Sequence, residues 1–490
     1  MRDTKLIEIL KVFSPKEWKD FEKFVASPYF PRGRDVSGLH ALLKKYYPDF
    51  NSDKLDIEKV FASLFPKENF NEKKLTNIAS DLTKMAEQFL DHECIASDSI
   101  MFNETLARVY KNKNNDRLYF KALTALDKKI PENNFASDVC FNVEEKYLLL
   151  TEEYYIGIHK FDKVMPIRVK RTELAALSFL VNFLRKQRDR LVLKSGYNFD
   201  LNSPLIESVY ESIDFDEMLK LMKEKKSEWY WLVEIYYYAF KSMLNLEDKS
   251  LYEKFQKAFY ENIDKLSRKE QYFIFNDFIA WLVARNDKLG IVSKEEEFEV
   301  FKKMLEHNAY SSSEKEYLSV MLYRTIMIMA LNICKYEWFE NFIKEYTPKL
   351  KPEYRDNMET FAKANMYFEN GKFEEALERI SKIPYDVFIY KLDIKNLMLK
   401  IYYELDLYEP AFSLINAFRN FLSTTDEFSD NFKAQHLNFL NFFNKLLKMK
   451  AGNNFEDAGF IIKEMQDKNY FASKSWLIKK ADNLKKSGKG

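Results

Sequence analysis

The chain has 490 residues, of which 46% are hydrophobic and 31% are charged, and its formal net charge at pH 7 is +1. This composition is typical of a folded protein and excludes a disordered one, and the near-neutral charge excludes a global attraction to nucleic acid or to anionic membranes. Only 10 glycines and 12 prolines occur. Because tight turns between strands and nucleotide-binding loops both need glycine, the composition favours an all-α protein.

Cysteine usage and apolar runs bear on the compartment. Three cysteines, Cys94, Cys140 and Cys334, lie far apart without CxxC spacing, which is typical of buried thiols in a reducing compartment. The longest apolar runs, 175–184 and 325–331, are shorter than the roughly 20 residues that a membrane-spanning helix needs. We therefore expect a cytoplasmic protein that does not enter a membrane.

Residues 1–96 are predicted to form a compact helical module. Ser14 is followed by Pro15 and then by Glu17, a pattern typical of a capping box at the start of a helix. A second helix of about 21 residues is predicted from Asn71, where apolar side chains recur at spacings of three and four. This seam is shorter than four heptads, which favours packing within the chain over an intermolecular coiled coil. Its residues are Leu75, Ile78, Leu82, Met85 and Phe89.

Residues 97–293 are predicted to form an irregular helical region. Helical stretches are indicated at 117–129, 143–155, 173–190 and 229–244. Alternating patterns typical of strands are scarce, so no sheet is expected here.

A basic segment lies within this region, between Lys163 and Lys194. It contains nine basic side chains, and its acidic ones are Glu173 and Asp189 alone. Its preference for arginine favours recognition of phosphate or carboxylate groups, so nucleic acid or an acidic partner is a candidate ligand. The alternative is that these cations pair with an acidic helix of the same chain, such as 141–155. The candidate residues are Arg168, Lys170, Arg171, Arg185, Lys186, Arg188 and Arg190.

Within residues 294–490 a short pattern recurs. The ten residues that begin at Tyr367 return 35 positions later, at Tyr402. Each copy contains an aromatic residue followed by an acidic one, with alanine three positions after the aromatic ring. Recurrence at this period is typical of stacked helix pairs, since each pair must bury a face on the next. The copies contain Phe373 with Ala376, Tyr408 with Ala411, and Phe455 with Ala458.

This C-terminal region resembles the tetratricopeptide repeat family. Gly371, Phe373 and Ala376 match the family's turn and its close contact between helices, whereas Asp406 replaces the glycine in the next copy. The resemblance implies an α-helical solenoid of antiparallel helix pairs, whose first helices line a groove for an extended or helical segment of a partner protein. The alternative is that neighbouring helices cover that groove. The groove residues that the resemblance implies are Phe361, Asn365, Phe368, Asn396, Lys400 and Tyr403.

No sequence motif indicates a catalytic, cofactor or metal site. The sequence lacks the phosphate-binding GxxxxGKS/T loop and the GxGxxG, HExxH and GxSxG motifs. His92 and Cys94 bring metal-ligand types together, but residues two apart on a helix point in different directions. We therefore expect a non-enzymatic scaffold or adaptor that binds a partner protein. The alternatives are a nucleic-acid-associated protein using 163–194 and an enzyme whose site is assembled from distant residues.

Overall fold

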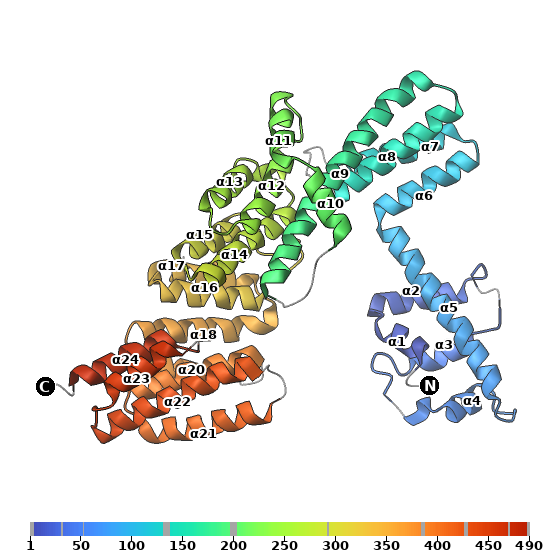
Figure 1. Cartoon of the computed structure of the whole chain (residues 1–490). Helices are drawn as coiled ribbons and strands as arrows, with labels where there is room; N and C mark the ends of the chain where they lie inside the picture. Colours follow the sequence, from blue (N-terminus) through green and yellow to red (C-terminus); the bar gives the residue numbers. More distant parts are fainter. Residues whose placement is uncertain are drawn as a thin grey trace. The chain divides into compact units, whose positions relative to one another are not determined.

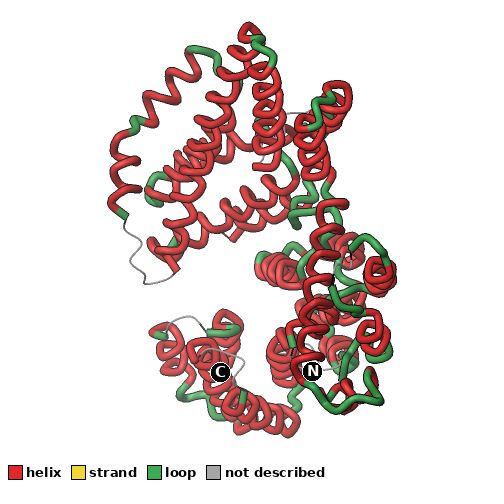
Figure 2. Tube along the Cα trace, turned by 90° about the vertical axis from the view of Figure 1, so that its right-hand side faces the viewer, coloured by secondary structure: helices red, strands yellow, loops and turns green. Residues whose placement is uncertain are grey.

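The computed structural model describes residues 4–30, 33–51, 53–130, 138–196, 203–291, 294–383, 388–425, 430–468 and 471–487. Within these ranges every regular element is a helix and no strand is present, as the scarcity of glycine predicts (Figures 1 and 2). The chain divides into two compact units. Unit 1 comprises Met1–Lys186 and Ile213–Tyr236, and unit 2 comprises Gln187–Ser212 and Tyr237–Gly490. The boundaries predicted after residues 96 and 293 fall inside unit 1 and unit 2, respectively.

The N-terminal region of unit 1 is a group of short helices packed on a long one, α5. The capping box is present: Ser14 Oγ accepts a hydrogen bond from the Glu17 N–H at 3.2 Å, and the Glu17 carboxylate accepts one from the Ser14 N–H at 2.7 Å. The predicted seam of α5 is buried in a core that extends from Leu6 to Phe89. The helices are α1 (Lys5–Lys11), α2 (Pro15–Ala26), α3 (Ser37–Lys44), α4 (Ile57–Leu64) and α5 (Glu72–Ser97), with a 3-10 turn at Asp53–Leu55.

The remainder of unit 1 contains a second, smaller core built by α6, α7 and α8. Tyr119 of α7 is fully buried there, and its hydroxyl donates a hydrogen bond to the Leu150 carbonyl of α8 at 2.5 Å. Helices α9 and α12 both cross the boundaries between the units in sequence. The helices are α6 (Ser99–Asn112), α7 (Asp116–Asp127), α8 (Asp138–Gly157), α9 (Phe161–Gly196), α11 (Phe215–Glu224) and α12 (Tyr230–Leu244).

Unit 2 continues as a succession of helices in which, from α14 to α24, each helix contacts the next along the chain. Contacts also join alternate helices, α16 with α18, α18 with α20 and α22 with α24. The helices are α10 (Pro204–Ser212), α13 (Lys249–Tyr260), α14 (Arg268–Leu289), α15 (Lys294–Glu306), α16 (Val320–Asn332), α17 (Tyr336–Tyr346), α18 (Pro352–Glu369), α19 (Phe373–Ile380), α20 (Phe388–Glu404), α21 (Tyr408–Thr424), α22 (Asp430–Gly452), α23 (Ala458–Asp467) and α24 (Lys474–Ser487), with 3-10 turns at Ile263–Lys265 and Thr347–Lys349.

One turn geometry recurs between successive helices of unit 2. Gly371, after α18, has φ of 73°, and Asp406, after α20, has φ of 55°, so both are left-handed. Aspartate tolerates this conformation better than most residues, which explains how Asp406 takes the place of a glycine. In each turn the next N–H donates to the carbonyl five residues earlier, the hydrogen bond of a Schellman motif. This bond joins Lys335 to Ala330, Lys372 to Tyr367, Leu407 to Tyr402 and Asn454 to Met449.

The alanines of the recurring pattern lie in helix contacts. Ala376 of α19, Ala411 of α21 and Ala458 of α23 each have 0% exposure. Because alanine has only a methyl side chain, it lets two helix backbones approach closely. The pattern that recurs in the sequence therefore marks a fully buried position on each of these helices.

Two of the cysteines differ from the sequence expectation in their exposure. Cys94 and Cys334 are exposed, so the expectation of buried thiols is wrong for these two. Cys94 lies on α5 beyond the buried seam, and Cys334 occupies a left-handed turn position with φ of 56°; the Cys140 side chain lies outside the described residues. Among the helices described, none is both long enough and apolar enough to cross a membrane.

Candidate functional site

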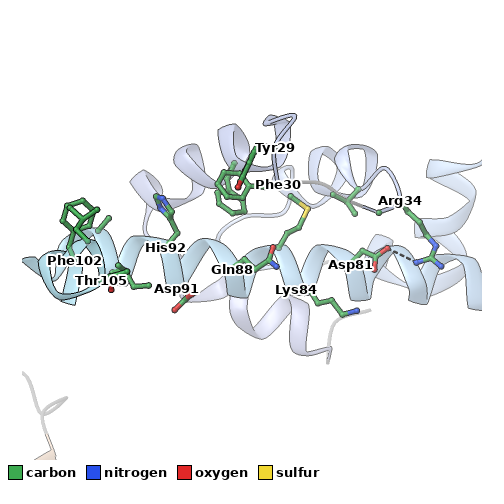
Figure 3. Close-up of a pocket in the computed structure, with 17 residues that line it drawn as sticks. Tyr29, Phe30, Arg34, Asp81, Lys84, Gln88, Asp91, His92, Phe102 and Thr105 are labelled. Carbon is green, nitrogen blue, oxygen red and sulfur yellow. Dashed lines mark hydrogen bonds and ion pairs between the residues drawn. The ribbon is translucent and has the colours of Figure 1, made fainter. Parts of the chain in front are cut away.

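A groove of about 750 Å³ runs along one face of α5 in unit 1 (Figure 3). Its base is a helical stripe at alternating spacings of four and three residues, which keeps the side chains on one face. One wall is the connection from α2 to α3, and the far end is the first turns of α6. The stripe contains Asp81, Met85, Gln88, His92 and Ile95.

The apolar wall of the groove forms where α2 ends. Pro28 lies two residues after Ala26, the last helical residue, and proline has no N–H with which to continue a helix. The chain therefore turns back, and the Phe30 ring stacks on Phe24 at 3.9 Å between centroids. Tyr29 packs edge-on against Phe30 at 5.2 Å, yet it is 69% exposed. The wall thus combines two packed rings with one that faces solvent.

The other end of the groove is closed by an ion pair. The Arg34 guanidinium lies 2.8 Å from the Asp81 carboxylate of α5, as Figure 3 shows. Gly33 permits this approach, because a Cβ atom at that position would lie 3.3 Å from Asp81 Oδ2. Arg34 and Asp81 both remain partly exposed, so the pair contributes at most about 1 kcal/mol to stability. Its main effect is to place polar groups at the edge of an apolar surface.

His92 is a titratable side chain on the base of the groove, and it packs with the aromatic wall. The His92 ring lies 6.4 Å from Phe24 and 6.2 Å from Phe30, so it extends the aromatic wall. Its Nδ1 is 3.8 Å from the Glu93 carboxylate, too far for a hydrogen bond. Across the described residues, no group of three histidine, cysteine or acidic side chains could hold a metal ion. The groove is therefore suited to binding apolar side chains.

The residues that the family resemblance implies for a partner groove lie on α18 and α20, and most of them face the chain's own helices. Phe361, Phe368, Asn396 and Tyr403 are buried. The Tyr403 ring lies 6.0 Å from Phe443 of α22 and 5.4 Å from Trp476 of α24. These four side chains are therefore not on the surface that the resemblance implies. Asn396 and Tyr403 of α20 face α22 and α24, and Phe361 and Phe368 are buried on α18.

The remaining two of these residues, Asn365 and Lys400, are half-buried. The Asn365 side chain donates a hydrogen bond to the carbonyl of Phe361, one turn earlier on α18, at 2.9 Å. Lys400 Nζ lies 5.8 Å from the Phe368 ring and 5.9 Å from the Trp476 ring. Burial lowers the pKa of Lys400, while the charge of Glu369 opposes that shift. The structure thus places Lys400 and Tyr403 close to Trp476, and Phe368 close to Lys400. The Asn365 side chain bonds within its own helix.

The N-terminal half of the basic segment pairs with acidic residues of α8. Burial raises the pKa of Glu152, but hydrogen bonds from Arg171 and Arg168 outweigh it, so the pKa of Glu152 lies below its ordinary value. This pairing agrees with the alternative that cations of the segment serve α8 and not an external ligand. The pairs are Arg168–Glu152 at 2.7 Å, Lys170–Glu144 at 3.1 Å, Arg171–Glu145 at 2.6 Å and Arg171–Glu152 at 2.5 Å.

The C-terminal half of the segment finds partners elsewhere. Arg188 forms an ion pair with Asp277 of α14, which is buried. Arg185 donates to the Asn182 side chain at 3.3 Å, and Lys186 and Arg190 also have interaction partners. The pairing of Arg188 with Asp277 joins residues 89 positions apart and could not be read from the sequence.

Sequence reasoning did not single out the α5 groove. It identified the buried seam of α5, of which Met85 also lines the groove. The polar members of the groove stripe, Asp81, Gln88 and His92, lie outside the seam and by themselves indicate only a solvated face. The sequence feature that could have indicated the groove is the pair of aromatic residues, Tyr29 and Phe30, directly after Pro28.

No protein-family model, curated protein or solved structure matches this chain. Its function is therefore inferred from the geometry of its own surfaces.

Proposed function

We propose that this protein is a non-enzymatic scaffold that binds a helical segment of a partner protein in the α5 groove. The observation that carries the proposal is an open groove that has an aromatic wall and is flanked by two exposed rings, Tyr29 at 69% and Phe102 at 44%. Aromatic side chains bury large areas, and they are enriched where proteins contact one another. Covering both rings and the groove would give a partner an apolar anchor site.

The dimensions of the groove suit a helix. Its α5 stripe extends from Asp81 to Ala96, which corresponds to about 22 Å at the helical rise per residue. A partner helix of about four turns would match this length. The volume of about 750 Å³ is sufficient for several apolar side chains. Such a helix would present them at positions i, i+3 or i+4, and i+7.

The rim of the groove favours an amphipathic partner over a purely apolar one. Lys84 and Asp91 line it, are exposed and carry opposite charges. Arg34 and Asp81 add a second pair of charges at one end. A partner helix with an apolar stripe could place acidic and basic side chains beside that stripe. Each charged group of the rim would then have an opposite charge nearby when the helix covers it.

We infer in addition that α16–α24 form a tetratricopeptide-like stack that serves as the scaffold. Three observations support this arrangement: the recurring Schellman turns, the contacts between successive and alternate helices, and the complete burial of Ala376 and Ala411. We assign no partner contact to Phe361, Phe368 or Tyr403, since helices of the chain cover them.

The alternative of nucleic-acid binding has weaker support. Binding to a phosphate backbone requires cations that are available to release counterions. Arg168, Lys170 and Arg171 have carboxylate partners on α8, and Arg188 has one on α14.

Site-specific cross-linking tests the groove. A photoreactive amino acid replaces Phe102 in the groove or, as a control, Val12, which is 73% exposed in the same unit and does not line the groove. In the native cell, the groove position is expected to cross-link to a partner that the control position does not reach. The cross-linked segment is then synthesised, and its affinity and helicity are measured with the full chain.

The expected result is a segment that gains helicity on binding and loses about tenfold or more in affinity when Tyr29→Ser and Phe102→Ser are combined. Val12→Ser should leave the affinity unchanged. Identical cross-links from both positions, or a bound segment that stays extended, would contradict the proposal.

A further inference from the structure

Unit 2 contains a cleft that is lined mainly by polar side chains and lacks the exposed aromatic wall of the α5 groove. It has a volume of about 330 Å³ and lies between α21 and α23, over the outer face of α22. Its lining is dominated by amide and charged side chains. Phe442 is its aromatic member, and that residue is buried beneath the surface.

The centre of the cleft is a row of asparagines on α22. Asn438, Asn441 and Lys445 are three and four residues apart and therefore lie on one face, with Asn444 beside them. Asn441 Oδ1 accepts a hydrogen bond from the Arg419 guanidinium of α21 at 2.9 Å, which leaves the donor side of this amide available. The side-chain amides of Asn438 and Asn444 have no hydrogen-bond partner among the described residues.

The charges of the cleft are mostly positive. Arg419, Lys445 and Lys468 line it together with a single carboxylate, Glu464. Lys445 pairs with Glu464 at 2.7 Å, so this carboxylate is already neutralised. Arg419 donates to the neutral amide of Asn441, and Lys468 is exposed at the end of α23 without a described ion-pair partner. Two cations are therefore left without a carboxylate in a lining of amides.

We infer that this cleft binds an extended acidic segment of a protein. An asparagine side chain offers one acceptor and two donor hydrogens, which suits the N–H and C=O groups of a peptide main chain. Arg419 can hold a carboxylate through two parallel hydrogen bonds, and Lys468 adds a point charge. The amide row thus holds the main chain, and the two cations select glutamate or aspartate side chains.

The size of the cleft also fits a peptide strand. Asn438 and Lys445 are seven residues apart on α22, which is about 10 Å along the helix axis. An extended peptide rises about 3.3 Å per residue, so roughly three residues span this row.

This site is independent of the α5 groove. It lies in unit 2, whereas the α5 groove lies in unit 1. Variants at Tyr29 and Phe102 alter no residue of the cleft, and variants of the cleft alter no residue of the groove. Failure of one proposal therefore leaves the other to be judged by its own experiment.

Fluorescence anisotropy with the full chain tests the inference. The probes are a labelled peptide of alternating glutamate and alanine and the same peptide with glutamine in place of glutamate. The glutamate peptide is expected to bind at least about tenfold more tightly, because a charge-assisted hydrogen bond is stronger than a neutral one. Combining Arg419→Ala with Lys468→Glu should weaken its binding by about tenfold or more.

A matched control separates the cleft from general surface charge. Lys463→Glu makes the same change of charge as Lys468→Glu alone, at an exposed residue of α23 that does not line the cleft. Lys468→Glu should weaken binding of the glutamate peptide, and Lys463→Glu should leave it nearly unchanged. Combining Asn438→Ala with Asn444→Ala should weaken binding several-fold with unaltered melting, because the peptide loses main-chain partners.

Three results would overturn the inference. The first is equal binding of the glutamate and glutamine peptides, or binding of neither. The second is an equal loss of affinity with Lys463→Glu and with Lys468→Glu. The third is displacement of the peptide by inorganic phosphate together with insensitivity to the two asparagine changes, which would indicate a simple anion site.

Discussion

Helices α5 and α20 each bury one face in a core of the chain, but the remaining faces of the two helices have different surroundings. On α20, Lys400 and Tyr403 lie beneath Trp476 of α24, and the Lys480–Glu404 ion pair at 2.5 Å joins the two helices. On α5, the stripe beside the buried seam stays open as a groove. A helix face therefore becomes part of a core where a later helix of the chain packs on it. Where no later helix packs on it, the face remains open as a candidate site.

The basic residues show the same contrast. Arg171 of α9 contacts Glu145 and Glu152 of α8, so its charge is used within the chain. Arg419 of α21 has a neutral amide as its partner and lines a cleft. Arg171 and Arg419 are the same residue type, each on a helix. The side chains of the neighbouring helix decide which of the two can bind a ligand. A surface is thus defined by what the fold leaves uncovered.

The largest expected effect comes from removing a covered ring. Tyr403→Ala should destabilise unit 2 by about 3–5 kcal/mol, because it leaves a cavity beneath Trp476 and Phe443. Phe102→Ala in the open groove should change stability by less than about 0.5 kcal/mol, since that ring is 44% exposed. Denaturant unfolding followed by circular dichroism measures both. Equal losses in the two variants would remove the distinction between covered and open faces.

An intermediate effect is expected from enlarging the alanines of the helix contacts. Ala376→Leu and Ala411→Leu should each cost about 1–3 kcal/mol, because both positions have 0% exposure and no room for a larger side chain. Ala417→Leu, on the exposed side of α21, is the matched control and should be nearly neutral. Thermal unfolding of the three variants gives the comparison. A control as unstable as Ala411→Leu would show that the recurring alanines are not special contacts.

A smaller effect is expected from pH, through a buried histidine. Burial lowers the pKa of His436 below 6.5, Asp393 opposes the shift and Arg324 adds to it. As the pH falls below 6.5, the unfolded chain takes up a proton that the folded chain does not, so stability decreases until the folded pKa is reached. Each unit of pKa depression corresponds to about 1.4 kcal/mol.

Unfolding at about pH 7.5 and pH 5.5 measures this loss. His436→Gln should reduce the dependence on pH, and His92→Gln should not, because the His92 side chain is 59% exposed. The same dependence in all three proteins would contradict the assignment to His436.

The smallest effect is expected from the basic segment. Arg168→Gln removes one exposed member of an ion pair and should cost at most about 1 kcal/mol. The wild-type protein should not bind duplex DNA or single-stranded RNA at about 0.15 M salt, because Lys170, Arg171 and Arg188 of α9 have carboxylate partners within the chain. Gel-shift titrations across a range of salt concentrations provide the measurement. A tight, salt-sensitive complex would favour the nucleic-acid alternative over the scaffold.

Local features of the fold were predictable from the sequence. The capping box at Ser14, the seam of α5 and the helical nature of the whole described chain all follow from interactions within about four residues. The recurring turn was predictable for the same reason, although Asp406 stands where glycine is expected. The length of α5 was underestimated, because its last turns continue beyond the apolar seam to Ser97.

The candidate sites were not predictable in this way. Periodicity reveals which face of a helix is apolar, but it carries no information on which distant helix will cover that face. Tyr403 is buried by Trp476, and Arg188 is neutralised by Asp277, through contacts between residues far apart in the chain. The sequence by itself therefore determined the helices and their turns. Only the tertiary structure decided which faces became core and which remained open as the α5 groove and the asparagine cleft.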